Sequence, residues 1–121
     1  MKREIIITDD GSATIYIPDW NEQYHSKHGA IQEAYHVFIN AGLEYFLTQL
    51  QPKPLKILEI GFGTGLNAFI TLLEADKNKI PINFTGVEAY PISSSEIEKL
   101  NYPLQLNSSD EYFKKCDGEI D

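Results

Sequence analysis

The sequence has a single cysteine, Cys116, so a disulfide bond within the chain is excluded and a cytoplasmic location is expected. It has no apolar run close to the ~20 residues that a membrane-spanning helix needs, and no signal-peptide pattern follows Met1. Basic residues are scarce as well: 10 Lys and Arg against 18 Asp and Glu give a net charge of −8, which argues against a broad phosphate-binding surface on this chain. With 121 residues, 42% of them hydrophobic, we expect one small domain with an apolar core and no membrane association.

The stretch 55–67 has the pattern of a buried strand, a glycine-rich turn and the start of a helix. The apolar residues of the strand are Leu55, Ile57, Leu58 and Ile60. The glycines of the turn are Gly61, Gly63 and Gly65, and a backbone this rich in glycine can approach a ligand closely. The apolar residues of the helix are Leu66, Phe69, Ile70 and Leu73. The free N–H groups at the start of this helix should therefore point toward whatever the turn holds.

A second strand is predicted over Ile82–Val87, with Glu88 at its end. Two strands joined by a helix form a β–α–β unit, and its right-handed crossover places the strands side by side and parallel. Glu88 should therefore lie next to the glycine turn.

The first part of the chain is predicted to hold a β-hairpin and a helix. Two β-rich segments, 4–8 and 13–18, flank an Asp10-Gly11 pair that is typical of hairpin turns. Residues 19–28 have no clear period and mix polar with aromatic side chains, as loops that line sites often do. The stretch 29–51 has helical periodicity, with a break or kink expected at Gly42 and an end at the prolines that follow, Pro52 and Pro54.

Two short helices are predicted near the C-terminus. Ser93 and Glu96 form a capping box for a helix that ends near residue 100. Ser108 and Glu111 repeat the signal for a helix that ends near residue 116. The Asn101-Tyr102-Pro103 sequence between them is predicted to break the helix.

These segments describe part of an α/β domain. None of the residues after Glu88 has the pattern of a further buried strand, whereas a doubly wound sheet has about five to six strands. We therefore expect one truncated domain, made of a hairpin and loop (1–28), a helical segment (29–51) and the first half of a Rossmann-like fold (55–121). The open edge of its sheet is a place for self-association.

The glycine turn is compatible with S-adenosylmethionine, with a dinucleotide, or with a purely structural role. The dinucleotide fingerprint G-x-G-x-x-G/A does not fit, because the glycines alternate and Leu66 is too large for the last small position. A P-loop is excluded, since no Gly-Lys-Ser/Thr follows. Glu59 completes the pattern E-x-G-x-G-x-G, which resembles the first motif of Rossmann-like methyltransferases. Glu88, about 20 residues past the turn, suits hydrogen bonds from ribose hydroxyls, so S-adenosylmethionine is favoured over the other two.

Several stretches outside the turn narrow the family. They are Asp10-Gly11-Ser12-Ala13-Thr14, Asn21-Glu22-Gln23-Tyr24-His25-Ser26, Gly29-Ala30, Glu33 and His36-Val37-Phe38-Ile39. Together with Glu59-Ile60-Gly61-Phe62-Gly63-Thr64-Gly65-Leu66-Asn67, they resemble the methyltransferase domain of MnmC-type tRNA-modifying proteins. The resemblance runs from about residue 5 to about residue 91.

The resemblance implies an α/β, Rossmann-like class I methyltransferase fold that begins with the hairpin and the helical segment. It implies transfer of a methyl group from S-adenosylmethionine to the aminomethyl nitrogen of a wobble uridine in tRNA. The candidate cofactor-binding residues are Glu59, Gly61, Phe62, Gly63, Thr64, Gly65, Asn67, Glu88, Tyr24 and Glu33. Tyr24 and Glu33 belong to a flap expected over the methionine end of the cofactor, the alternative being a loop that only packs against the first helix.

The family's later Asp-Ala-Phe segment, which helps form its catalytic pocket, is not found in these 121 residues. We therefore expect the catalytic residues beyond residue 121, the tRNA-binding surface outside this chain, and no activity from the chain alone. No metal site is expected either, because the candidates His25, His28, Glu33 and His36 have no cysteine partner and no zinc spacing. A non-catalytic α/β interaction module, or a methyltransferase with a different substrate, is the alternative.

Overall fold

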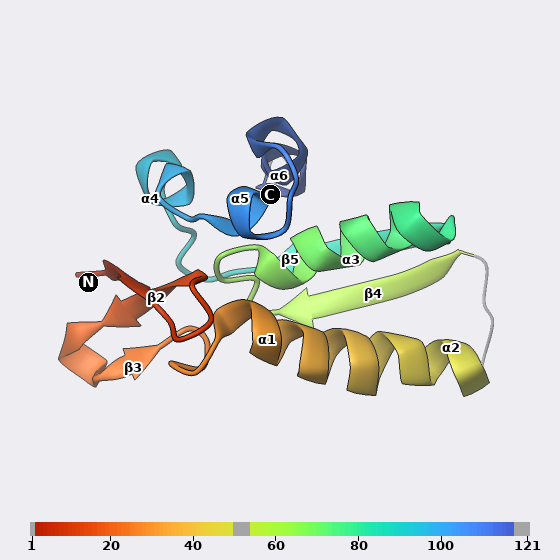
Figure 1. Ribbon diagram of the computed structural model, residues 1–121, viewed down its shortest axis with the longest axis horizontal. Coiled ribbons are helices and arrows are strands. Elements are labelled where there is room, and N and C mark those ends of the chain that lie inside the picture. The colour runs from red at the N-terminus through yellow and green to blue at the C-terminus, as the bar shows by residue number, and fades with distance from the viewer. Residues whose placement is uncertain (1, 50–53, 118–121) are drawn as a thin grey trace.

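The computed structural model describes residues 2–49 and 54–117, with side chains as far as residue 114 in the last helix. Two small sheets and several helices form an α/β structure. Figure 1 shows a long N-terminal helix and helix α3 (Leu66–Asn78) running alongside strand β4 (Leu55–Ile60). The predicted helix end at Pro52 and the side chain of Cys116 lie outside the described residues.

The N-terminal sheet confirms the predicted hairpin. Strand β1 (Glu4–Ile7) pairs antiparallel with β2 (Ala13–Ile17), and β2 also pairs with the short strand β3 (Glu22–Gln23). The segment predicted as a loop therefore contains β3, together with the 3-10 turn η1 (Pro18–Trp20).

The long helix follows the hairpin and has three parts. These are α1 (Ala30–Ala34), a wider π-helical part η2 (Tyr35–Glu44) and α2 (Tyr45–Gln49). The break predicted at Gly42 is wrong, because the helix continues through it in the π register. Ile39 and Leu43 are buried in this part, and their packing outweighs the low helix propensity of glycine.

The strand–helix–strand unit is confirmed. Strands β4 and β5 (Ile82–Val87) are parallel and in register from the pair Leu55–Ile82 to the pair Ile60–Val87. Half-buried and exposed residues alternate along both strands, so the helices cover one face of this sheet. The other face exposes Leu58, Ile60 and Val87.

Among the described residues, β4 and β5 form a sheet of two strands, each with one unpaired edge. Self-association through such an edge stays a prediction. In the same part of the chain, no helix has the length and apolar character needed to cross a membrane.

Three short helices lie above the glycine turn in Figure 1. Helix α4 (Ser94–Glu98) has the predicted capping box of Ser93 and Glu96. Helix α6 (Asp110–Asp117) is capped by the Ser109 hydroxyl, which accepts a hydrogen bond from the Tyr112 N–H at 3.1 Å, one residue later than predicted.

The predicted break after α4 is confirmed, since α4 ends at Glu98 and Asn101 is not helical, but a further helix, α5 (Tyr102–Gln105), begins within 101–103. Pro103 stands in the first turn of α5, where its missing N–H removes no helical hydrogen bond. Tyr102 is fully buried, and its hydroxyl donates to Thr64 Oγ1 in the glycine turn at 3.3 Å. Burial raises the pKa of Tyr102, which keeps this hydroxyl protonated as a donor.

The residue before Tyr102 joins the hairpin to the same region. Asn101 Nδ2 donates to the Gly11 carbonyl at 2.8 Å, and Asn101 Oδ1 accepts from the Ala13 N–H at 2.7 Å. Arg3 makes a second connection, a bidentate pair with Glu96 in which both N–O distances are 3.0 Å. The hairpin and the C-terminal helices are therefore tied together across most of the sequence.

One continuous apolar core lies between these elements. Its buried residues are Ala13, Ile15, Ala30, Ala34, Ile39, Leu43, Leu55, Leu66, Phe69, Ile70, Ile92, Leu100, Tyr102 and Phe113. Phe113 packs against Phe69 and Tyr102 with ring centroids 4.9 and 5.8 Å apart, so α6 covers the start of α3.

We expect Tyr102→Phe to lower the free energy of unfolding by about 1 kcal/mol, because it removes only the hydrogen bond to Thr64. Tyr102→Ala should cost ~3–5 kcal/mol, since it also leaves a cavity in the core. Chemical denaturation measures both values. Tyr90→Phe, at an exposed position, is the control. No loss of stability in Tyr102→Phe would contradict the hydrogen bond from the hydroxyl to Thr64.

Candidate functional site

The glycine turn lies at the carboxyl ends of the parallel strands, the edge where ligands bind in open α/β sheets. The φ angles of Gly61, Gly63 and Gly65 are 86°, 61° and 80°, a region that other residues rarely adopt. The N–H groups of Gly61 and Phe62 donate to the Val87 carbonyl at 2.8 and 3.0 Å, so the turn starts as an extension of the sheet. No side chain caps the first turn of α3, which starts directly after the turn.

Glu88 holds the turn from the neighbouring strand. Its Oε1 accepts a hydrogen bond from the Gly63 N–H at 2.7 Å, and its Oε2 accepts from the Tyr90 N–H at 3.1 Å. The carboxylate is therefore fixed at the end of β5, and each oxygen keeps a second lone pair for a ligand.

Glu59 lies on β4 opposite Gly86 of β5, and it is half-buried. Its Oε2 accepts from Asn67 Nδ2 at 2.6 Å, while its buried Oε1 has no hydrogen-bond partner among the described residues. Burial raises the pKa of Glu59, the negative charge of Glu88 raises it further, and the Asn67 hydrogen bond opposes both. Within the described part of the chain, this carboxylate thus has one oxygen that accepts a hydrogen bond and one that does not.

The opposite wall comes from the loop and from α1. The Ser26 N–H donates to Glu33 Oε1 at 3.1 Å, which ties the loop to the helix. The Tyr24 ring lies against the turn, since a Cβ on Gly63 would be 3.2 Å from Tyr24 Cδ2. His25 Nδ1 is 2.8 Å from Thr14 Oγ1, and burial lowers the pKa of His25 despite the opposing charge of Glu33.

A cavity of about 450 Å³ lies between these walls, within the usual size range of ligand pockets. It is lined by Tyr24, His25, Glu33, Ala34, Val37, Phe38, Glu59, Gly61, Phe62, Gly63, Asn67 and Glu88. Its ionised groups are acidic: Glu33, Glu59 and Glu88 face it, and no lysine or arginine is among the described residues that line it. A cationic or hydroxyl-rich ligand suits such a cavity better than an anionic one.

All but two of the predicted site residues line this cavity. Thr64 is buried behind the turn, where it accepts the hydrogen bond from Tyr102, and Gly65 is the buried N-cap of α3. Sequence reasoning missed the cavity wall formed by Ala34, Val37 and Phe38, although their positions on one helical stripe were visible.

Gly86 is a further residue that sequence reasoning missed. A Cβ at this position would overlap Cδ2 of Phe62, so the Phe62 ring packs directly on the β5 backbone. No local signal marks this contact, because it joins a turn residue to a strand residue far along the sequence.

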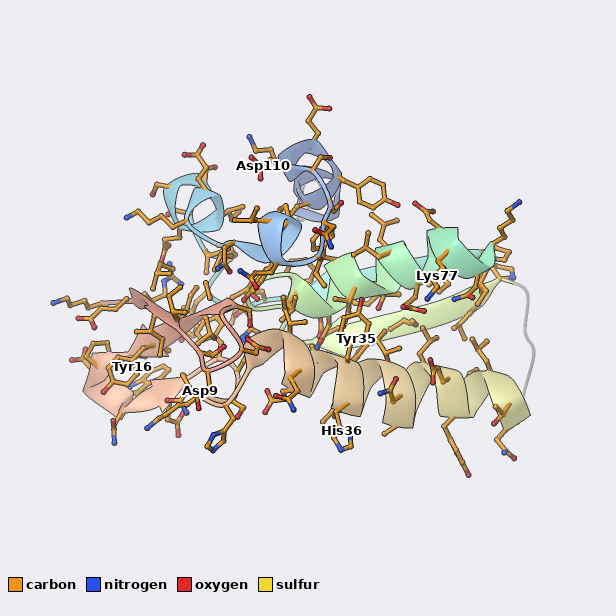
Figure 2. The ribbon with its side chains drawn as sticks, viewed as in Figure 1. Asp9, Tyr16, Tyr35, His36, Lys77 and Asp110 are labelled. Atoms are coloured by element: carbon orange, nitrogen blue, oxygen red, sulfur yellow. The ribbon has the colours of Figure 1, made fainter. Side chains whose placement is uncertain are left out.

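The candidate metal ligands are dispersed. His36 points away from the helix to solvent, while its neighbour Tyr35 points toward α3 (Figure 2). His28 is exposed and lies 3.4 Å from an Asp9 carboxylate oxygen. Within 2–49 and 54–117, no group of three or more His, Cys, Asp or Glu side chains is arranged to hold a metal ion.

We expect Gly86→Ala to lower the free energy of unfolding by about 1–3 kcal/mol, because the new Cβ displaces the Phe62 ring. Alanine is otherwise more favourable than glycine in a strand, so a loss of stability can only come from this clash. Thr85→Ala, at the exposed neighbouring position, is the control. Unchanged or increased stability in Gly86→Ala would contradict the packing of Phe62 on β5.

We expect Glu59→Gln to raise the free energy of unfolding of the unliganded chain by about 1 kcal/mol at pH 7, because a buried charge is replaced by a neutral amide. Since the pKa of Glu59 is raised on folding, its ionisation removes stability as the pH rises above 4.5, the unfolded value. The gain in Glu59→Gln should therefore shrink as the pH falls toward 4.5.

Chemical denaturation between pH 4 and pH 8 measures this gain, as a difference from the unsubstituted chain. Glu44→Gln, which removes one exposed carboxylate, controls for the net charge. A gain that is the same at every pH, or that matches Glu44→Gln, would contradict the role of burial at Glu59.

The comparisons with known proteins agree with one another. The "tRNA 5-methylaminomethyl-2-thiouridine biosynthesis bifunctional protein MnmC" of Acidovorax sp. (strain JS42) is 35% identical over 101 residues, which cover 80% of this chain and 15% of that protein. The protein of the same name from Burkholderia multivorans is 35% identical over 104 residues, covering 84% of the chain and 15% of its own length. In Leptospira borgpetersenii the identity is 37% over 84 residues, covering 66% and 13%. The chain thus spans about 15% or less of these relatives.

The crystal structure of MNMC2 from Aquifex aeolicus shares the fold. Its TM-score is 0.76 at 24% identity, and the match covers 98% of this chain and 38% of that one. No protein-family model matches the chain. The predicted α/β fold, of the Rossmann-like methyltransferase type, is therefore confirmed. From the sequence matches, the chain belongs to the family of MnmC-type tRNA 5-methylaminomethyl-2-thiouridine biosynthesis proteins, where it corresponds to part of the N-terminal methyltransferase domain.

Proposed function

We propose that this chain is the cofactor-binding part of a methyltransferase that uses S-adenosylmethionine, with residues from 55 onward forming the first half of the cofactor-binding fold. The acidic cavity carries the proposal. Three carboxylates would repel the phosphates of a dinucleotide, whereas S-adenosylmethionine brings an ammonium group, a sulfonium group and ribose hydroxyls. The unpartnered Oε1 of Glu59 supports it further, because a ligand donor would complete its hydrogen bonding.

Each predicted residue has a role in this proposal. Glu88 accepts hydrogen bonds from the ribose hydroxyls with the lone pairs left free by Gly63 and Tyr90. Glu59 orders the turn through Asn67 and offers its second oxygen to the cationic end of the ligand. The other proposed contacts are Gly61, Phe62 and Gly63 from the turn and Tyr24 and Glu33 from the opposite wall. Thr64 and Gly65 do not line the cavity, and their role is to fix the turn and the start of α3.

When bound, S-adenosylmethionine supplies an electrophilic methyl group that an acceptor nitrogen displaces from sulfur. The residues of this chain hold and orient the cofactor, and positioning of this kind accounts for much of the rate of a displacement that needs an in-line approach. We assign no catalytic residue to this chain. The proposal places the catalytic residues, and the pocket for the acceptor, in other parts of the longer protein.

The proposed acceptor is tRNA. The relatives are named for the biosynthesis of 5-methylaminomethyl-2-thiouridine in tRNA, and this chain matches only 13–15% of their length. We infer that the longer protein methylates the aminomethyl nitrogen of a wobble uridine. Because the net charge of the chain is −8, the surface that holds the tRNA phosphates is proposed to lie outside it.

We expect S-adenosylhomocysteine to bind the longer protein that contains this chain, measured by titration calorimetry. Glu88→Gln should weaken binding about tenfold or more, because hydrogen bonds to a charged group are worth ~1.5–3 kcal/mol. Glu98→Gln, at an exposed position, is the matched control and should bind normally.

NADH serves as the competing ligand, and we expect no binding. If neither S-adenosylhomocysteine nor S-adenosylmethionine binds, the cofactor proposal fails and a non-catalytic interaction module replaces it. If S-adenosylhomocysteine binds but tRNA that carries a wobble aminomethyl group is not methylated, the proposed cofactor stands and the proposed substrate is wrong.

A further inference from the structure

The first N–H groups of the long helix are capped by side chains of the hairpin turn, about twenty residues earlier in the sequence. The Ala30 N–H donates to Thr8 Oγ1 at 3.1 Å and the Ile31 N–H to Ser12 Oγ at 3.1 Å. The Gln32 N–H donates to Asp10 Oδ2 at 2.9 Å. A helix is usually capped by the residue just before it, but Gly29 has no side chain for this.

Asp10 is the centre of this cap. Its Oδ1 accepts from the Ser12 N–H at 2.9 Å, from Thr8 Oγ1 at 3.0 Å and from the Ser12 hydroxyl. The same carboxylate therefore caps Gln32 directly and orients the two hydroxyls that cap the other N–H groups. Burial acts to raise the pKa of Asp10, but the hydrogen bonds from Ser12, Gln32 and Thr8 outweigh it and lower the pKa. The carboxylate is thus charged, as the positive end of a helix dipole favours.

The hairpin turn packs closely against the backbone just before the long helix, at Gly29. A Cβ on Gly29 would be 2.5 Å from Asp10 Oδ2, so only glycine lets the carboxylate come this close to the backbone. The neighbouring residues are joined as well, since the Asp9 N–H donates to the Lys27 carbonyl at 2.8 Å.

The cap lies one residue away from the cavity wall. Glu33 follows Gln32 directly, faces the cavity and accepts the hydrogen bond from the Ser26 N–H. Tyr24 and His25, just before Ser26, line the same cavity. The first turn of the helix, which Asp10 caps, therefore carries Glu33, and Glu33 in turn binds the loop.

We propose that Asp10 is a positioning residue, which holds Glu33 and the loop 24–26 over the cavity so that they receive the amino-acid end of the cofactor. This inference rests on the proposed function. It assigns no ligand contact to Asp10, because Asp10 acts through the start of α1 and is not among the residues that line the cavity.

The test compares Asp10→Asn with Asp9→Asn in the protein that contains this chain. Both residues are exposed in the same turn and both substitutions remove one negative charge, but Asp9 takes no part in the cap. Two ligands separate the two ends of the site. Adenosine reaches only the proposed ribose side at Glu88, while S-adenosylhomocysteine also reaches the proposed amino-acid side at Glu33.

Asp10→Asn should weaken S-adenosylhomocysteine about tenfold and leave adenosine within about twofold, because the amide NH2 group replaces one of the two oxygens that accept the hydrogen bonds of Ser12 and Gln32. Hydrogen exchange of the Ser26 amide in the unliganded protein should become about tenfold faster. Asp9→Asn should leave both affinities and the exchange rate of the Ser26 amide unchanged. Thr8→Val is the milder second variant, because it removes the acceptor of the Ala30 N–H and one hydrogen bond to Asp10 but keeps the carboxylate that caps Gln32. It should weaken S-adenosylhomocysteine more than adenosine as well, by a smaller factor.

The proposal is overturned if Asp10→Asn behaves like Asp9→Asn, or if it weakens both ligands equally, which indicates a general loss of structure. If Asp10→Asn does not fold, the same two outcomes in Thr8→Val decide. If the unsubstituted protein binds neither ligand, the proposed function fails. The exchange rate of the Ser26 amide then still decides whether Asp10 holds the loop in place.

Discussion

The hydrogen bond from the Gly63 N–H to the Glu88 carboxylate is the interaction on which the candidate site depends. It joins the turn after β4 to the end of β5, two points 25 positions apart in the sequence. The bond is possible because the strands are parallel and in register, so that both carboxyl ends reach the same edge. Once the turn is held there, α3 starts beside the cavity, and Glu59 faces it from β4.

The same arrangement carries an energetic cost at Glu59. Glu33, Glu59 and Glu88 share one cavity, and Glu59 has a buried oxygen without a partner among the described residues. Burial raises the pKa of Glu59, and the negative charge of Glu88 raises it further. A core built only for stability would replace such a group with an apolar one. In the proposed function, a donor on the bound ligand completes the hydrogen bonding of Glu59 Oε1.

The parts predicted from the sequence are those that depend on local pattern. Alternating glycines after an apolar run predict a turn at a strand end, and the β–α–β rule then brings Glu88 to it. The predictions failed where contacts between residues far apart in the sequence determine the local structure. Gly42 does not break the helix because Ile39 and Leu43 are buried, and Tyr102 starts a helix because its ring fills the core. Gly86 was missed because the ring that leaves no room for a side chain there belongs to Phe62, which is distant in the sequence.

The hairpin turn and the glycine turn are both bound by the same short segment of the chain. Asn101 binds the hairpin turn at Gly11 and Ala13, and the next residue, Tyr102, donates to Thr64 in the glycine turn. The hairpin turn in turn caps α1 through Asp10. The two walls of the cavity, α1 on one side and the glycine turn on the other, are thus held by the same pair of residues. A site made from segments this far apart in sequence can keep a fixed width only through connections of this kind, because each turn alone has many accessible conformations.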